Sequence, residues 1–289
     1  MKRNFKVVLG TVLLFVLWGF SVDALAVPEY YPTTGRTIHV PHPSGLVHSD
    51  DAFWVLSRDW SVEPAIATRL YKYSAKPDTW GQLLGDYSVP QVDNVQGLAW
   101  DLTHWWIVDN SGWTADKINK CELTATGLNV VQSYDWPYSG PVSVEWAQSY
   151  LWVADNHTDV IYRVTVGDTS FTSVEPWSSG NISPYGLAWD GTHMWSLCSP
   201  AGGGTHGPRE IYKHDVNGDI IEIWHYPPVN EPVYGGAGLG LAIADKRLYY
   251  SDYYSNQIIE LVPIPAPGAL VLGGIGVGFV GWLRRRKAV

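Results

Sequence analysis

Three aspartates at equivalent places in a recurring sequence pattern are the first candidates for chemistry. Asp109, Asp155 and Asp252 each stand thirteenth in a fourteen-residue segment, and asparagine follows the first two. Carboxylate and amide oxygens gathered on one rim are ligands that Ca²⁺ accepts. The same residue types at the end of a strand also cap the following turn through bonds to its backbone amides. The sequence leaves both interpretations open, and the regular recurrence favours the turn cap.

A second group of candidates lies where the pattern is interrupted. The loops 58–64 and 200–206 are longer than their counterparts, and long loops on a rigid scaffold often carry binding. Exposed tryptophan beside polar groups is suited to a sugar or a peptide. These loops and their neighbours supply the predicted ligand-binding residues Arg58, Asp59, Trp60, Trp113, His157 and His206. Ordinary variation in loop length explains the insertions equally well.

No catalytic motif stands out from this background. The sequence contains neither GxSxG nor HExxH, and no cysteine and histidine have a recognisable catalytic spacing. The two cysteines, Cys121 and Cys198, fall in repeats that are not neighbours, so we predict that they are not joined by a disulfide. No cofactor other than Ca²⁺ at the carboxylate rim is indicated.

The candidates are positioned by the fourteen-residue segment, here termed the frame, which occurs five times at intervals of 43 to 54 residues. Each frame begins with a small residue, and the five starts are Gly45, Gly97, Ser143, Gly186 and Gly240. Each carries an aromatic residue at its tenth position, namely Trp54, Trp106, Trp152, Trp195 and Tyr249. The interval is typical of propeller blades. We interpret each frame as two short strands whose tenth-position aromatic packs between adjacent sheets.

Further strands complete each repeat. A third strand is indicated at Leu70–Lys72 and its equivalents, and a fourth at Val130–Tyr134. The fifth repeat lacks a fourth strand, whereas Thr37–Pro41 precedes the first frame. We therefore predict an all-β fold: a five-bladed β-propeller of four-stranded antiparallel blades, with the last blade closed by the N-terminal strand. A six-bladed propeller is the alternative if segments 29–41 and 58–68 contain further strands.

The repeats resemble those of the NHL-type, YVTN-like propeller superfamily, in which frames of the form GLAWD…LWVADN…IYRV are common. The resemblance covers residues 37 to 262 and implies a fold rather than an activity. Members include lactonases, lyases, cyclotransferases and binding modules. The lactonases hold a metal with a glutamate, an asparagine and an aspartate near the axis. Asp109, Asp155, Asn110 and Asn156 match the last two types, but Glu145 is the only glutamate inside a predicted first strand, and an axial glutamate is not evident.

The N-terminus has the three parts of a secretory signal peptide, which we predict over residues 1–26. Lys2, Arg3 and Lys6 form the charged region, 7–20 the apolar run, and Ala24–Ala26 the cleavage site. The apolar run is shorter than the about 20 residues that a transmembrane helix needs. Residues 27–262 then form the predicted propeller.

Residues 263–289 combine a proline motif, a glycine-rich apolar helix predicted to cross a membrane at about 267–283, and a basic cluster. This tail resembles the PEP-CTERM sorting signal of exported bacterial proteins, although its proline motif lacks the usual central glutamate. The resemblance implies recognition by an exosortase-type membrane protease. A plain tail anchor is the alternative. The predicted sorting residues are Pro265, Pro267, Arg284, Arg285 and Arg286.

The charge of the chain agrees with export to the cell surface. The net charge is −9, and the middle is more acidic still because basic clusters lie at both ends. An acidic exported domain is unsuited to nucleic acid. We therefore expect an exported propeller, sorted to the cell surface or extracellular matrix, that binds carbohydrate or peptide or serves as a matrix module. The alternative is a propeller enzyme, a metal-dependent lactonase, hydrolase or lyase acting at the channel mouth.

Overall fold

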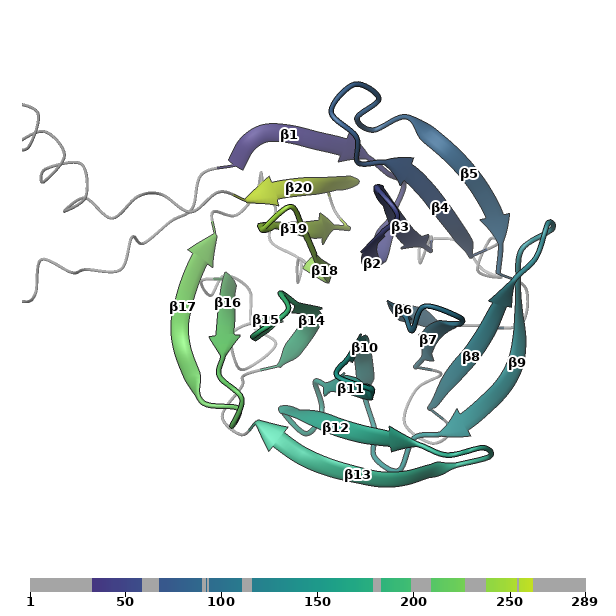
Figure 1. Ribbon diagram of the computed structural model, residues 1–289, viewed down its shortest axis with the longest axis vertical. Coiled ribbons are helices and arrows are strands. Elements are labelled where there is room, and N and C mark those ends of the chain that lie inside the picture. The colour runs from purple at the N-terminus through teal and green to yellow at the C-terminus, as the bar shows by residue number, and fades with distance from the viewer. Residues whose placement is uncertain are drawn as a thin grey trace, which may run out of the picture. The chain divides into compact units, whose positions relative to one another are not determined.

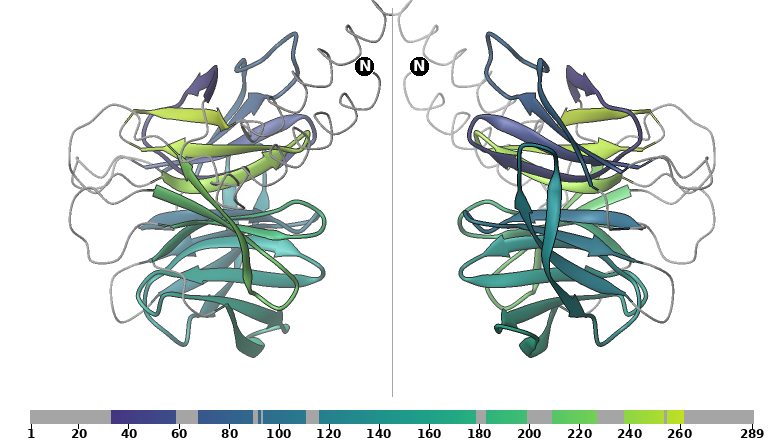
Figure 2. Two further views of the ribbon diagram at one scale, coloured as in Figure 1. Left: turned by 90° about the vertical axis from the view of Figure 1, so that its left-hand side faces the viewer. Right: turned by 90° about the vertical axis from the view of Figure 1, so that its right-hand side faces the viewer.

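Twenty strands form the part of the chain that the structure, a computed structural model, describes: residues 33–58, 68–89, 92, 94–110, 116–178, 183–198, 209–226, 238–253 and 255–261. The strands make five antiparallel sheets of four strands each. Figure 1 shows these sheets as blades around a central axis, and Figure 2 shows the same ring from two sides. The predicted five-bladed propeller is confirmed, and the six-bladed alternative is wrong.

In every blade the first strand is innermost and the fourth is outermost (Figure 1). Blade 1 contains β2 (Pro43–Ser49), β3 (Ala52–Ser57), β4 (Arg69–Ser74) and β5 (Leu83–Ser88). Blade 2 contains β6 (Val95–Trp100), β7 (Trp105–Asp109), β8 (Lys117–Leu123) and β9 (Leu128–Asp135). Blade 3 contains β10 (Pro141–Ala147), β11 (Tyr150–Asp155), β12 (Val160–Val166) and β13 (Phe171–Ser178). Blade 4 contains β14 (Pro184–Trp189), β15 (Met194–Cys198), β16 (Arg209–His214) and β17 (Ile220–Tyr226).

Blade 5 is built from both ends of the described chain. It contains β18 (Gly238–Ala244), β19 (Arg247–Asp252) and β20 (Gln257–Leu261), and β1 (Thr33–His39) pairs with β20 as its fourth strand. Ile38 lies opposite Ile258 in this ladder. The predicted closing strand is thus confirmed, with a start at Thr33 and an end at His39 instead of Pro41. Closure of this kind leaves no open edge between the first and last blades.

The ends of the chain are not covered by this description. The predicted signal peptide (residues 1–26) and the predicted sorting tail (263–289) lie outside the described residues. Within the described strands and loops, no helix is long and apolar enough to span a membrane.

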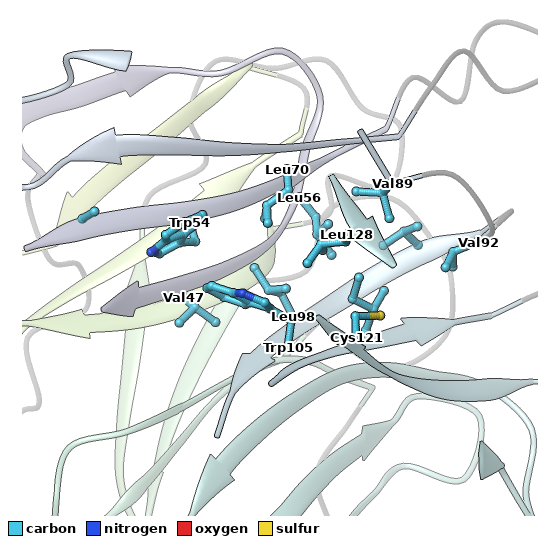
Figure 3. Close-up of a cluster of buried hydrophobic side chains, with 13 residues drawn as sticks. Val47, Trp54, Leu56, Leu70, Val89, Val92, Leu98, Trp105, Cys121 and Leu128 are labelled. Carbon is cyan, nitrogen blue, oxygen red and sulfur yellow. The ribbon is translucent and has the colours of Figure 1, made fainter. Parts of the chain in front are cut away.

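The tenth-position aromatics form the centres of the cores between blades, as predicted. Their exposed fractions lie between 1 and 6 %. Figure 3 shows one such core, in which the rings of Trp54 and Trp105 lie 4.8 Å apart between blades 1 and 2. Lys72, opposite Trp54 on the next strand, places its ammonium group 4.6 Å from the Trp54 ring centre. Such a cation above an aromatic face stabilises the pair while its stem covers the ring.

The small residue at the start of each frame lies where inner strands of adjacent blades approach each other. A Cβ atom on Gly97 would lie 2.6 Å from the Cα of Ser143 in the next blade. A Cβ atom on Gly240 would lie 2.6 Å from the amide nitrogen of Leu46. In blade 3 the frame begins with Ser143, whose Oγ accepts a hydrogen bond from the amide of Leu187 at 3.3 Å. The small frame residue therefore sets how closely the inner strands pack around the axis.

The two cysteines lie in blades that are not neighbours, as predicted. Cys121 lies on β8 in blade 2 and Cys198 ends β15 in blade 4, and both are buried and free. The prediction that they are not joined is confirmed. Burial raises the pKa of each thiol to about 12, so neither is a reactive thiolate in the folded protein.

Candidate functional site at the channel mouth

The loops that follow the second strands and the loops that join blades lie at the same end of the sheets, because the strands alternate in direction. We refer to this end as the entry rim. A repeated backbone hydrogen bond builds it: the residue after the second strand donates its amide to the residue before the first strand. The observed pairs are Arg58 to His42 (3.1 Å), Asn110 to Asn94 (2.9 Å) and Asn156 to Gly140 (3.0 Å).

Arg58 and Asp109, both predicted site residues, are brought together on this rim by Asn94. The Arg58 guanidinium donates from Nη1 to Oδ1 of Asn94. The amide of Asn94 in turn donates to Oδ1 of Asp109 at 3.2 Å. The side-chain amide of Asn94 also donates to the carbonyl of Asn110. Asn94 was not predicted as a site residue because it lies between blades, outside the repeated frame.

Asp155 is integrated into the rim of blade 3. Its side chain is 0 % exposed. Oδ1 accepts hydrogen bonds from the amides of His157 (3.0 Å) and Thr158 (2.9 Å), and Oδ2 accepts one from the indole of Trp136 (2.8 Å). The side chain of His157 is exposed on the same loop. These contacts are those of a turn cap.

Asp252 occupies the equivalent place in blade 5. It is 1 % exposed, and its Oδ1 accepts a hydrogen bond from the amide of Ser255 at 3.3 Å. Because Asp109, Asp155 and Asp252 stand in blades 2, 3 and 5, a Ca²⁺ ion bound at any one of them would draw its other ligands from carbonyl, amide or water oxygens. Throughout the described ranges, no group of three or more His, Cys, Asp or Glu side chains is placed to hold a metal ion.

The remaining predicted residues are not located by this structure. Asp59, Trp60, Trp113 and His206 lie outside the described residues, as do the sorting residues Pro265, Pro267 and Arg284–Arg286.

Glu145 is a further functional candidate, on the inner strand β10. It stands third in its frame, where the other blades carry Val47, Ala99, Ala188 and Ala242, all at most 9 % exposed. The carboxyl group of Glu145 accepts a hydrogen bond from the amide of Trp189 in the next blade, and burial raises its pKa to about 8. The sequence already marks Glu145 as the only glutamate of a predicted first strand, and its type breaks the repeat at this frame position.

Comparison with known proteins supports the fold and nothing finer. No protein-family profile matches the sequence, and no curated protein does. The structure is similar to that of Myxococcus xanthus glutaminyl cyclase (TM-score 0.56, 11% identity, covering 78% of this chain and 94% of that one). It is also similar to the Phanerochaete chrysosporium exo-β-1,3-galactanase bound to β-1,3-galactotriose (TM-score 0.52, 12% identity, covering 85% of this chain and 65% of that one). At such identities the likeness establishes a propeller fold alone.

Proposed function

We propose that this protein is an exported propeller whose entry-rim loops bind carbohydrate or peptide at the cell surface or in the extracellular matrix, without chemistry of its own. The main observation behind the proposal is the burial and hydrogen bonding of the Asp155 carboxylate. Its carboxylate is fully buried and accepts two backbone amides and an indole. A recurring carboxylate used in this way supports the rim, which leaves selectivity to the loops mounted on it.

The proposed localisation at the cell surface is based on the two ends of the sequence. The predicted signal peptide (1–26) supports export, and the proline motif, apolar segment and basic cluster of 263–289 support sorting by an exosortase-type protease. The partners implied are that protease, the export machinery and, through the C-terminal segment, the membrane.

The binding proposal is tested with residues 27–262 on glycan and peptide arrays, followed by calorimetry on the ligands retained. We expect the variants Trp60→Ala and His157→Ala to weaken binding about tenfold or more, as anchor residues do. Leu102→Ala is the matched control, because Leu102 is 82 % exposed in a hairpin at the opposite end of the sheets. Binding that neither rim variant affects would contradict the proposal.

A propeller enzyme is the second candidate, favoured by the hydrogen-bonded chain of Arg58, Asn94 and Asp109 at the rim. Polar groups from two blades already meet there, as a metal-dependent lactonase, hydrolase or lyase requires. Divalent-metal binding and turnover of a lactone or ester, both lost in Asp109→Asn, would establish this function in place of simple binding. Asp135→Asn is the control, since that carboxylate is exposed on the outer strand β9.

The proposed localisation is tested by deleting residues 284–287. Loss of the four cations should release or mislocalise the protein, because a basic cluster that follows a membrane-crossing segment holds that end of the segment in the cytoplasm. Deletion of Ala288 and Val289 alone serves as the control. Unchanged surface display after removal of the cations would contradict the sorting proposal.

A further inference from the structure

The segment that joins blades 2 and 3 presents an aromatic side chain to solvent at the entry rim. It comprises residues 136–140, of sequence WPYSG, between β9 and β10 (Figure 1). Tyr138 in this segment is 42 % exposed, more than any other phenylalanine, tyrosine or tryptophan in the described part of the chain. The joining segments before β2 and β6, residues 40–42 and 89–94, contain none of these three residue types. The exposed ring is therefore a departure from the repeat.

Two buried rings hold the ring of Tyr138 in place. It stacks on the ring of Tyr162, with the centroids 4.7 Å apart and the planes at 19°, and it meets Trp136 edge-on at 5.8 Å. Tyr162 and Trp136 are only 5 and 6 % exposed. Among the described residues, Tyr138 makes no further ring contact. Because Tyr162 covers one face of Tyr138, the opposite face is the one that is open to solvent.

Hydrogen bonds at both ends of the segment fix the backbone that carries Tyr138. At the first end, the amide of Trp136 donates to the carbonyl of Asp116 at 2.9 Å, and its indole donates to Oδ2 of Asp155 at 2.8 Å. At the other end, the amide of Gly140 donates to Oδ2 of Asp116 at 2.9 Å. The open face is thus oriented before any ligand arrives, which lowers the entropy lost on binding.

Polar groups lie beside the aromatic face. Ser139 follows Tyr138, and the turn 156–159, of sequence NHTD, packs against the joining segment. A Cβ atom on Gly140 would lie 2.7 Å from the Cβ of His157 in that turn, and His157 is exposed. Hydroxyl, amide and imidazole groups that donate or accept hydrogen bonds are therefore available next to the ring. Neither the joining segment nor the turn contains lysine or arginine.

A neutral pyranose ring with equatorial hydroxyls matches this combination of groups. Its faces carry only C–H groups, which pack on an aromatic ring, while its edge carries hydroxyls that donate and accept hydrogen bonds. A proline-rich peptide also packs on aromatic rings, but proline has no N–H to donate to the neighbouring polar groups. An extended peptide strand requires an open sheet edge, whereas Tyr138 lies in a segment between two sheets. An acidic sugar would find no cation in these two segments.

We propose that the open face of Tyr138 binds one pyranose ring of a neutral carbohydrate, whose hydroxyls bond to groups of Ser139 and the turn 156–159. The inference rests on the binding function proposed above: it selects carbohydrate over peptide and assigns the contact to the junction of blades 2 and 3. Because neither partner of the stacked pair is charged, the affinity should not fall when the salt concentration is raised.

The probe is cellohexaose, a neutral chain of glucose rings with equatorial hydroxyls, and hexaproline is the peptide counterpart. Calorimetry is performed on the full chain in a detergent without a sugar head group. Tyr138→Ala should weaken cellohexaose binding about tenfold or more, as loss of an aromatic anchor does. Tyr138→Phe keeps the ring face and should retain most of the affinity. Val131→Ala is the control in the same blade and should bind like the wild type, because Val131 is 46 % exposed on the outer strand β9.

Three results would each overturn the inference: no binding of cellohexaose, equal affinity in wild type and Tyr138→Ala, or binding of hexaproline in place of the sugar. If Tyr138→Ala does not fold, the ring resonances of Tyr138 in the wild type, assigned with Tyr138→Phe, decide; they should shift with cellohexaose, and unchanged resonances would overturn the inference. Array binding that Trp60→Ala weakens and Tyr138→Ala does not would overturn it and leave the proposed function standing. An array without any binder would contradict the proposed function itself.

Discussion

His214 illustrates how a single residue of this propeller can resemble a catalytic group while serving the fold. It is 0 % exposed. Nδ1 lies 3.3 Å from the carbonyl of Gly218, which can only accept, so Nδ1 carries the hydrogen. Nε2 then accepts from the hydroxyl of Ser196 at 2.8 Å. The resulting serine–histidine pair is buried within blade 4 and holds the β16–β17 hairpin against β15.

The burial of His214 predicts a specific pH dependence of stability. Burial lowers the pKa of His214 from 6.5 to about 4, so the unfolded chain takes up a proton first as the pH falls. The stabilisation is complete above pH 6.5 and is lost between pH 6.5 and 4, by about 3 kcal/mol in total. Denaturant unfolding of wild type and His214→Gln across this range measures the difference. His157→Gln, at an exposed histidine, is the control. An equal loss in wild type and His214→Gln would contradict the prediction.

The contribution of Glu145 to stability changes with pH in the opposite direction to that of His214. Variants of each residue are therefore compared separately. Because the pKa of Glu145 is raised from 4.5 to about 8, its folded form is favoured below pH 4.5 and loses that advantage as the pH rises to 8. The windows of Glu145 and His214 overlap between pH 4.5 and 6.5. Wild-type stability alone would therefore conceal both effects.

At the scale of strands, the contact between adjacent inner strands explains the small residue of the frame. Gly97→Ala should destabilise the protein by about 1–3 kcal/mol, because the new Cβ meets the backbone of β10 rather than a movable side chain. Denaturant unfolding measures the loss. Val131→Ala is the control in the same blade, because Val131 is 46 % exposed on the outer strand β9. A loss for Gly97→Ala no greater than that of the control would mean that the inner strands shift freely.

This contact also marks the limit of what the sequence predicted. Strand order and the closing strand followed from local pattern, since Thr37–Pro41 had the place of a fourth strand and Ile258 that of a third. The approach of Gly97 to Ser143 depends on two blades meeting in space, and no local pattern contains it. Asn94 was missed as a site residue because it lies outside the shared frame, whereas Glu145 was noted as the only glutamate of a predicted first strand but was not taken as a site residue.

At the scale of the whole molecule, the last blade is completed by a strand distant in sequence, so the ring should unfold as a unit. Ile38 on β1 is 3 % exposed and belongs to one core with Phe53 of blade 1 and Tyr249 and Ile258 of blade 5. Two further backbone contacts fasten the junction. The amides of Val40 and His42 donate to the carbonyl and Oδ1 of Asn256, at 2.9 and 2.7 Å. A substitution that weakens the packing between blades 5 and 1 should therefore lower the stability of distant blades as well.

The two buried thiols show whether a weakened junction between blades 1 and 5 also destabilises distant blades. Ile38→Ala should lower the free energy of unfolding by about 2–5 kcal/mol, as for other buried isoleucines. Thiol labelling in increasing urea, read by mass spectrometry, follows Cys121 in blade 2 and Cys198 in blade 4 separately. A closed ring requires both thiols to become reactive at one midpoint, and Ile38→Ala should shift both equally. Ile221→Ala, 53 % exposed on the outer strand β17, should shift neither by much. Separate midpoints would show that blades unfold independently and that β1 stabilises only its own sheet.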